Sequence, residues 1–69
     1  MKVGYIYKNM HATGVDPSIV LVLSVTMLKK DHLGREIFPP LECANCVNVT
    51  DVQDKRWIKR PYWKSWEEV

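Results

Sequence analysis

The feature that most constrains this chain is a short apolar run at residues 19–27. The run reads IVLVLSVTM, so it is mostly β-branched residues and leucine, and turn-forming residues lie on both sides of it. β-branched side chains favour the pleated strand because a helix restricts their rotamers. The run is also far shorter than the roughly 20 residues of a membrane-spanning helix. We therefore expect a buried central strand, with a buried helix as the competing interpretation.

Shorter extended segments flank this run. Residues 2–8 alternate between two faces, as a strand does, and residues 43–50 form another extended stretch. The polar residues 29–35 predict the turn of a hairpin that continues at Ile37, and Gly34 can take the positive φ that such a turn needs.

Three further segments predict interruptions of the sheet. Residues 9–18 are rich in turn formers and predict a loop, and residues 51–54 predict a turn. Pro39 and Pro40 donate no ladder hydrogen bond, so they predict a corner or an edge.

The C-terminal residues 55–69 are unusual because they combine tryptophans with cations. A helix would align three apolar residues at a spacing of four, yet it would hold Pro61 in its interior at a cost of about 3 kcal/mol. We expect a strand that is broken at Pro61, with a short turn or strand at residues 66–69. Strand alternation would place Trp57 and Trp63 on one face.

The number of strands and the chain length indicate the architecture. With 69 residues, we expect one mostly β domain spanning residues 1–69. Four or five short strands close most economically into a small barrel or an orthogonal sandwich, because closure hides the sheet edges.

Two parts of the chain resemble a known fold family. Residues 2–7 (KVGYIY), a glycine-containing loop and residues 19–23 (IVLVL) resemble the start of Src-homology-3-like small barrels. Residues 63–69 (WKSWEEV) are similar to the last turn and closing strand of these barrels. The family includes KOW-type barrels and small barrel proteins of tailed bacteriophages. The resemblance implies a small barrel of four to five antiparallel strands and a phage-encoded accessory protein, although a scaffold does not fix a function.

Cys43 and Cys46 form a C-x-x-C pair, the one motif with a metal or redox interpretation. Zinc takes four ligands, and the spacing to His11 and His32 matches no zinc-finger pattern. A redox role would need the first cysteine at a helix N-terminus, whereas a strand pattern follows. We expect no metal and no cofactor, with one cysteine packed as a small hydrophobe and the other semi-exposed. A metal- or redox-linked module remains a third hypothesis.

The sequence carries no pattern of catalytic residues. Its eight acidic residues are scattered, and none lies in the apolar runs where burial would shift a pKa. The two histidines fall in expected loops. We therefore expect a protein that is not an enzyme. Because residues 1–8 do not start a secretory signal, we expect a cytoplasmic protein that does not enter a membrane.

The strongest functional signal is at residues 55–64, of which five are basic, three are aromatic and none is acidic. A domain this small cannot hide all six of its tryptophan and tyrosine rings. Some rings must face outward beside the cations and form a docking surface. The residues of this expected surface are Arg56, Trp57, Lys59, Arg60, Tyr62, Trp63 and Lys64.

Two functions from different classes use this surface. In the first, the protein is a non-enzymatic module that docks on a protein partner of host or phage, or on itself. The alternative is a nucleic-acid-binding barrel in which Trp57, Tyr62 and Trp63 stack on bases while the cations contact phosphates. Two observations argue against a docking role for this surface in either function. Rings of so small a domain are usually its core, and residues 31–54 carry five acids that can pair with the basic tail.

Overall fold

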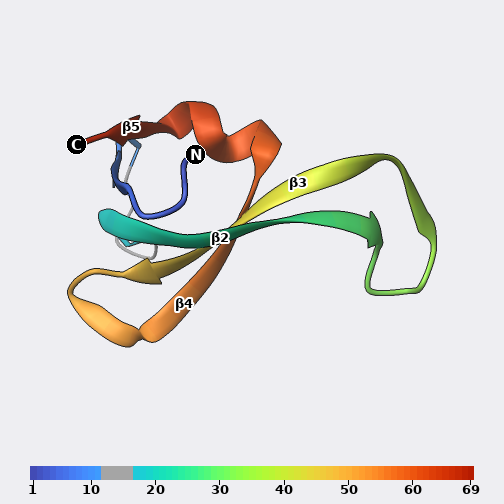
Figure 1. The fold of residues 1–69 in the computed structure, drawn as a ribbon, viewed down its shortest axis with the longest axis horizontal. Helices are drawn as coiled ribbons and strands as arrows, with labels where there is room; N and C mark the ends of the chain where they lie inside the picture. Colours follow the sequence, from blue (N-terminus) through green and yellow to red (C-terminus); the bar gives the residue numbers. More distant parts are fainter. Residues whose placement is uncertain (12–16) are drawn as a thin grey trace.

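The computed structural model describes residues 1–11 and 17–69, which form one antiparallel sheet (Figure 1). In chain order the elements are β1 (Ile6–Asn9), β2 (Ile19–Lys30), β3 (Glu36–Asn48), β4 (Asp51–Lys59), the 3-10 helix η1 (Arg60–Ser65) and β5 (Trp66–Glu68). The order across the sheet is β4-β3-β2-β1-β5. The expectation of a mostly β fold with four to five antiparallel strands is confirmed, whereas the closure of these strands into a barrel is not. Within the described ranges, no helix has the length and apolarity needed to cross a membrane.

The apolar run at residues 19–27 forms the central strand β2, which continues to Lys30. β2 lies between β1 and β3, with Val20 opposite Tyr7 and Val22 opposite Cys46. Both valines are fully buried. The next residue, Leu23, is 47% exposed, so β2 is not covered on both faces as a fully buried strand would be. The β-branched residues form a strand, and the helical interpretation is wrong.

The core lies on one face of the sheet, under η1. Trp63 and Trp66 pack against it from η1 and β5. Its buried members are Tyr7, Val20, Val22, Ala44, Cys46 and Ile58.

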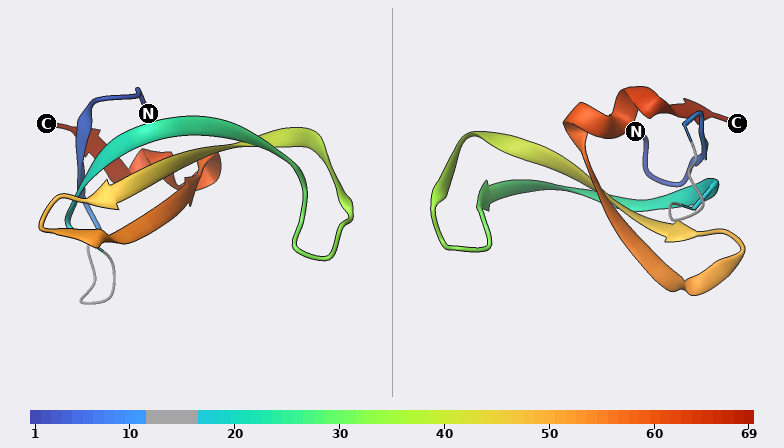
Figure 2. Two further views of the ribbon diagram at one scale, coloured as in Figure 1. Left: turned by 60° about the horizontal axis from the view of Figure 1, so that its bottom comes forward. Right: turned by 180° about the vertical axis from the view of Figure 1, so that it is seen from behind.

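The sheet is open. β4 and β5 are its two edges, and no pairing joins them in the part of the chain that the structure describes. η1 crosses from the β4 edge to the β5 edge over the core (Figure 2). β5 then pairs with β1, with Trp66 opposite Asn9.

β2 and β3 continue past the end of β4 as a two-stranded arm, residues 27–42. β4 ends at Lys59, which lies opposite Cys43 of β3. The arm projects along the longest axis of a molecule that measures 34 × 20 × 20 Å (Figure 1). A side-chain oxygen of Asp31 closes its turn by accepting hydrogen bonds of 2.9 Å from the amides of Leu33 and Arg35. The arm lengthens the molecule without adding to its core.

The positive φ expected at Gly34 is confirmed at 81°. The turn itself is shorter than expected, because Lys29 and Lys30 belong to β2.

Pro39 and Pro40 lie inside β3, so the expected start of this strand at residue 43 is wrong. Around the prolines the register slips: residues 37–40 of β3 all lie opposite the single residue Lys29 of β2. β3 has no second neighbour here among the described residues, so the prolines leave no central ladder bond unmade. The expectation that they mark an edge is confirmed.

The first expected strand, residues 2–8, is wrong in its first half. Gly4 has φ 83°, and the amide of Tyr5 donates to the carbonyl of Lys2 at 3.2 Å. The chain therefore turns before β1 starts at Ile6, because this positive φ is outside the extended region. The loop expected at residues 9–18 starts one residue later than expected, because Asn9 is the last residue of β1. Residues 12–16 of this loop lie outside the described residues.

The turn expected at residues 51–54 lies at Val49 and Thr50 instead. The side-chain oxygen of Asn48 accepts hydrogen bonds from the amide of Thr50 at 3.1 Å and from its hydroxyl at 2.9 Å. An asparagine that bonds two residues ahead stabilises a tight connection. β4 therefore starts at Asp51, immediately after the turn.

Candidate docking site

The site begins where Pro61 ends β4. The strand runs to Lys59, and Pro61 occupies the first turn of η1, where its missing N–H is not needed. The break expected at Pro61 and the short strand expected after it, which is β5, are confirmed. η1 then carries its side chains back over the open side of the sheet.

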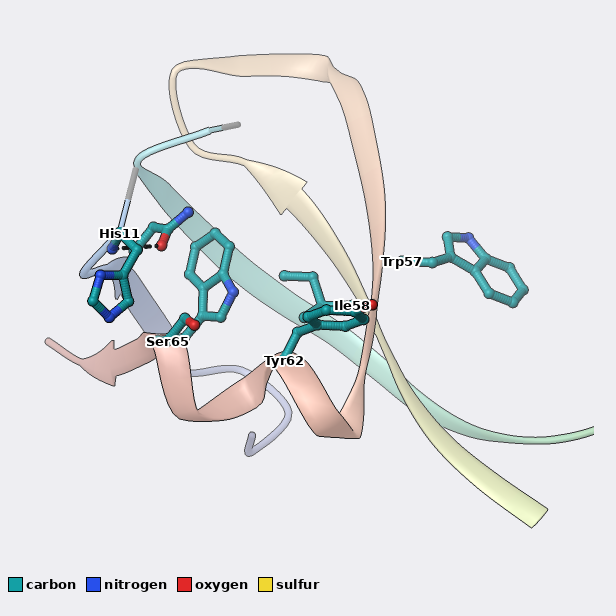
Figure 3. Close-up of a pocket in the computed structure, with 7 residues that line it drawn as sticks. His11, Trp57, Ile58, Tyr62 and Ser65 are labelled. Carbon is teal, nitrogen blue, oxygen red and sulfur yellow. Dashed lines mark hydrogen bonds between the residues drawn. The ribbon is translucent and has the colours of Figure 1, made fainter. Parts of the chain in front are cut away.

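A cleft of about 330 Å³ lies between the edge of β4 and the elements η1, β5 and the end of β1 (Figure 3). Buried Ile58 forms its floor, and the ring of Tyr62 lies across Ile58. Trp66 also lines the cleft. Tyr62 is 63% exposed, although it lies against a buried side chain. The full lining is Asn9, His11, Trp57, Ile58, Tyr62, Ser65 and Trp66.

The polar residues of the cleft lie at its β1 end. The side-chain oxygen of Asn9 accepts a 3.0 Å hydrogen bond from the backbone amide of His11. Among the described residues, no hydrogen bond joins the His11 imidazole to the Ser65 hydroxyl, and no cluster of three metal-ligating side chains occurs. The cleft is chemically an aromatic receptor with a polar end.

Trp57 borders this cleft, but its indole points away from it (Figure 3). The sheet register aligns Trp57 with Asn45 and Ser24 on the opposite face, which we call the outer face. The Asn45 amide donates a 2.7 Å hydrogen bond to the Ser24 hydroxyl. Like Tyr62, Trp57 is 63% exposed. The two exposed rings of residues 55–64 therefore lie on different faces.

Trp63 is not part of an exposed surface. Its indole N–H donates a 2.7 Å hydrogen bond to the carbonyl oxygen of Ile58, and its ring packs against the core. The expectation that Trp57 and Trp63 share a face is wrong, because η1 replaces the strand after Lys59 and its alternation no longer applies.

Acidic residues from the middle of the chain hold two of the expected cations. Arg60 pairs with Glu42 at 2.9 Å, and Arg56 pairs with Asp54 at 2.7 Å. Hydrogen bonds from Arg56, and then from Asn48, hold the pKa of Asp54 below its ordinary value. The expectation that acids of residues 31–54 pair with the basic tail is confirmed for both arginines.

Lys59 and Lys64 differ from the arginines. Both are exposed, and neither forms an ion pair within the described parts of the chain. Lys64 belongs to η1 beside the cleft, whereas Lys59 lies on the outer face with Trp57.

The expectation that a small core must leave some rings outside is confirmed. Tyr7 is buried, Trp63 and Trp66 are half-buried, and the other three rings are exposed. Those three are Tyr5, Trp57 and Tyr62.

The candidate residues thus form two sites rather than one. Sequence reasoning missed the contribution of β1 to the cleft, through Asn9 and His11, because β1 reaches η1 only through its long-range pairing with β5. No local spacing signals that pairing.

Both cysteines are buried, so the expected semi-exposed cysteine is wrong. Cys46 belongs to the core, whereas the register places Cys43 on the outer face, between Thr26 and Lys59. Burial raises the pKa of the Cys43 thiol. Burial, and then the charge of the Cys43 thiolate, raises the pKa of Cys46 to about 11. Both thiols are therefore protonated at neutral pH.

Comparison of this chain with known protein families, with curated proteins and with solved structures found no match. Function is therefore inferred from the cleft and the outer face themselves.

Proposed function

We propose that this protein is a non-enzymatic binding module whose cleft receives an apolar or aromatic side chain of a protein partner. The observation that carries the proposal is Tyr62, which is 63% exposed while its ring lies across buried Ile58 in a cleft that Trp66 also lines. Tyrosine and tryptophan are the residues that most often anchor protein interfaces, since each offers a large rigid apolar area with a polar tip.

The size of the cleft indicates the size of its occupant. Pockets for drug-sized ligands span roughly 300 to 1,000 Å³, and a cavity of about 150 Å³ is enough to hold a benzene ring. The cleft, at about 330 Å³, fits one side chain with part of its neighbour. The exposed cation Lys64 of η1 favours a partner that carries an acidic residue close to that side chain.

The Src-homology-3-like relationship is part of this proposal. It is supported by the order of the last elements, in which the turn of η1 leads to β5 and β5 pairs with β1. The relationship implies a phage-encoded accessory protein that works in the cytoplasm on a host or phage protein.

Selection from a random-peptide display library tests the proposal without a known partner. We expect the enriched peptides to share an aromatic or large apolar residue, and their binding to be lost in Tyr62→Ala. Val52→Ala is the control, because Val52 is an exposed apolar residue of β4 that does not line the cleft. Enriched peptides that bind Tyr62→Ala as well as the wild type, or that lose binding in Val52→Ala, would contradict the proposal.

A second candidate function, binding of single-stranded nucleic acid, is favoured by the outer face. Along β4, Lys55 and Lys59 lie on the same face as Trp57, one on each side of it. Their cross-strand neighbours contain no carboxylate: Leu21, Val47, Ser24, Asn45, Thr26 and Cys43. An exposed ring between two cations suits a base stacked on the ring with its phosphates on the lysines.

Titration with a single-stranded oligonucleotide at low salt tests this second function through tryptophan fluorescence. We expect quenching that is lost in Trp57→Ala, that survives in Tyr62→Ala and that weakens as salt is added. Absence of quenching in the wild type would eliminate this function and leave the cleft proposal untouched.

A further inference from the structure

The arm carries the most exposed large apolar side chain in the described part of the molecule. Phe38 is 93% exposed, and Leu33 and Met27 of the same arm are 65% and 50% exposed. The arm stands away from the core, so nothing in the described fold covers these residues (Figure 2). A phenylalanine held almost entirely in water is a candidate anchor for an interface.

The local structure presents Phe38 as a side chain rather than as part of a strand edge. Phe38 lies in the bulge of residues 37–40, which all face Lys29 of β2. Bulges re-aim side chains. Pro39 and Pro40 follow directly, and without amide hydrogens they cannot pair with an incoming strand. The tip of the arm is therefore suited to insert a ring into a pocket, and unsuited to extend a sheet.

The cleft offers a pocket of matching chemistry in the same chain, in the body of the molecule. It has an apolar floor at Ile58, aromatic walls at Tyr62 and Trp66, and room for one ring and part of its neighbour. The arm extends along the longest axis, away from η1 and β5, whose residues line the cleft (Figure 1), so Phe38 cannot enter the cleft of its own chain.

We propose that Phe38 of one copy enters the cleft of a second copy, so that the chain assembles head to tail. This inference rests on the proposed function of the cleft and names its occupant. Because the arm of the second copy remains free, the contact is heterologous and repeats from copy to copy. The assembly grows with concentration, either as an open chain or as a closed ring.

Sedimentation velocity over a wide range of protein concentration tests the proposal. The wild type is expected to form species larger than a dimer. Phe38→Ala and Tyr62→Ala are each expected to remain monomeric, and both residues are exposed enough for the fold to survive their removal. Val52→Ala, which removes an apolar side chain that is 70% exposed in β4, is the matched control and assembles as the wild type does.

Mixing the two variants gives the sharpest result. Phe38→Ala keeps an intact cleft and Tyr62→Ala keeps an intact arm, so an equimolar mixture forms a dimer and stops there. A wild type that stays monomeric at every concentration, a Phe38→Ala variant that still assembles, or a mixture that stays monomeric would overturn the inference.

The same measurements separate this inference from the proposed function. If the wild type is monomeric but display-selected peptides still need Tyr62, the cleft is a docking site for another protein and only self-assembly is rejected. If peptides bind without Tyr62, both are rejected.

Discussion

The indole nitrogen of Trp63 donates a 2.7 Å hydrogen bond to the carbonyl oxygen of Ile58. This bond joins η1 to β4, which is an edge strand of the sheet. It gives the Ile58 carbonyl oxygen the hydrogen-bond partner that a neighbouring strand would otherwise supply. It also fixes η1 over the core, which brings Tyr62 across Ile58 and leads the chain to Trp66 (Figure 3). The geometry of the cleft therefore depends on Trp63, although Trp63 does not line it.

We predict that Trp63→Phe lowers the free energy of unfolding by about 1 to 2 kcal/mol, because the ring is kept but a carbonyl loses its partner. Trp63→Ala is expected to lower it further, since packing against the core is lost as well. Urea unfolding measures both changes. Trp57→Phe is the control and should alter stability by less than about 0.5 kcal/mol, since Trp57 is exposed. Equal losses for Trp57→Phe and Trp63→Phe would contradict the assigned roles.

The raised pKa of Cys46 makes the stability of the fold depend on pH in the alkaline range. Its pKa is raised from 9.0 to about 11 in the folded protein, so folding favours the neutral thiol. The unfolded chain then loses this proton at a lower pH than the folded protein does. Stability is therefore complete below about pH 9 and falls between about pH 9 and pH 11, by an amount on the order of 2 kcal/mol. Urea unfolding at a series of pH values measures the fall.

The thiol contribution is isolated by comparing the wild type with Cys46→Ala. The variant starts with lower stability because it leaves a small cavity, but the difference between the two proteins should shrink as the pH rises. A constant difference across this range would show that Cys46 does not titrate as its burial requires.

A substitution at Gly34 should affect the turn of the arm only through the backbone conformation. The φ of Gly34 is 81°, and a Cβ placed there would meet nothing within 4 Å. Gly34→Ala should therefore destabilise the turn by about 1 kcal/mol through backbone strain alone. Because the chain is short enough for chemical synthesis, D-alanine at this position is a direct control and should restore the stability. Loss of stability with both enantiomers would point to a steric clash instead.

The fold could be predicted where a local cause decides it. β2 followed from the β-branched residues of 19–27, and the break after β4 followed from Pro61, because each effect acts within a few residues. The turn at Gly34 has the same kind of cause. The turn after β3 was placed too late in the sequence, because several residues of that region favour turns. The hydrogen bonds from Thr50 to the side chain of Asn48 fix its actual position.

The candidate site was predicted in part. The size of the core correctly required exposed rings, but strand alternation could not assign their faces once η1 replaced the strand. The cleft itself depends on Asn9 pairing with Trp66, which lie at opposite ends of the chain. Such a pairing depends on closing the whole fold, and no residue pattern near either position signals it. The outward position of Phe38 likewise depends on the register slip between β2 and β3.

Chemical-shift mapping by NMR during titration with a display-selected peptide shows directly whether the cleft is the binding site. We predict that the perturbed amides cluster at Asn9, Ser65 and Trp66 around the cleft, and that Tyr62→Ala abolishes the perturbations. Perturbations centred instead on the outer face, at Ser24, Asn45 and Trp57, would contradict it.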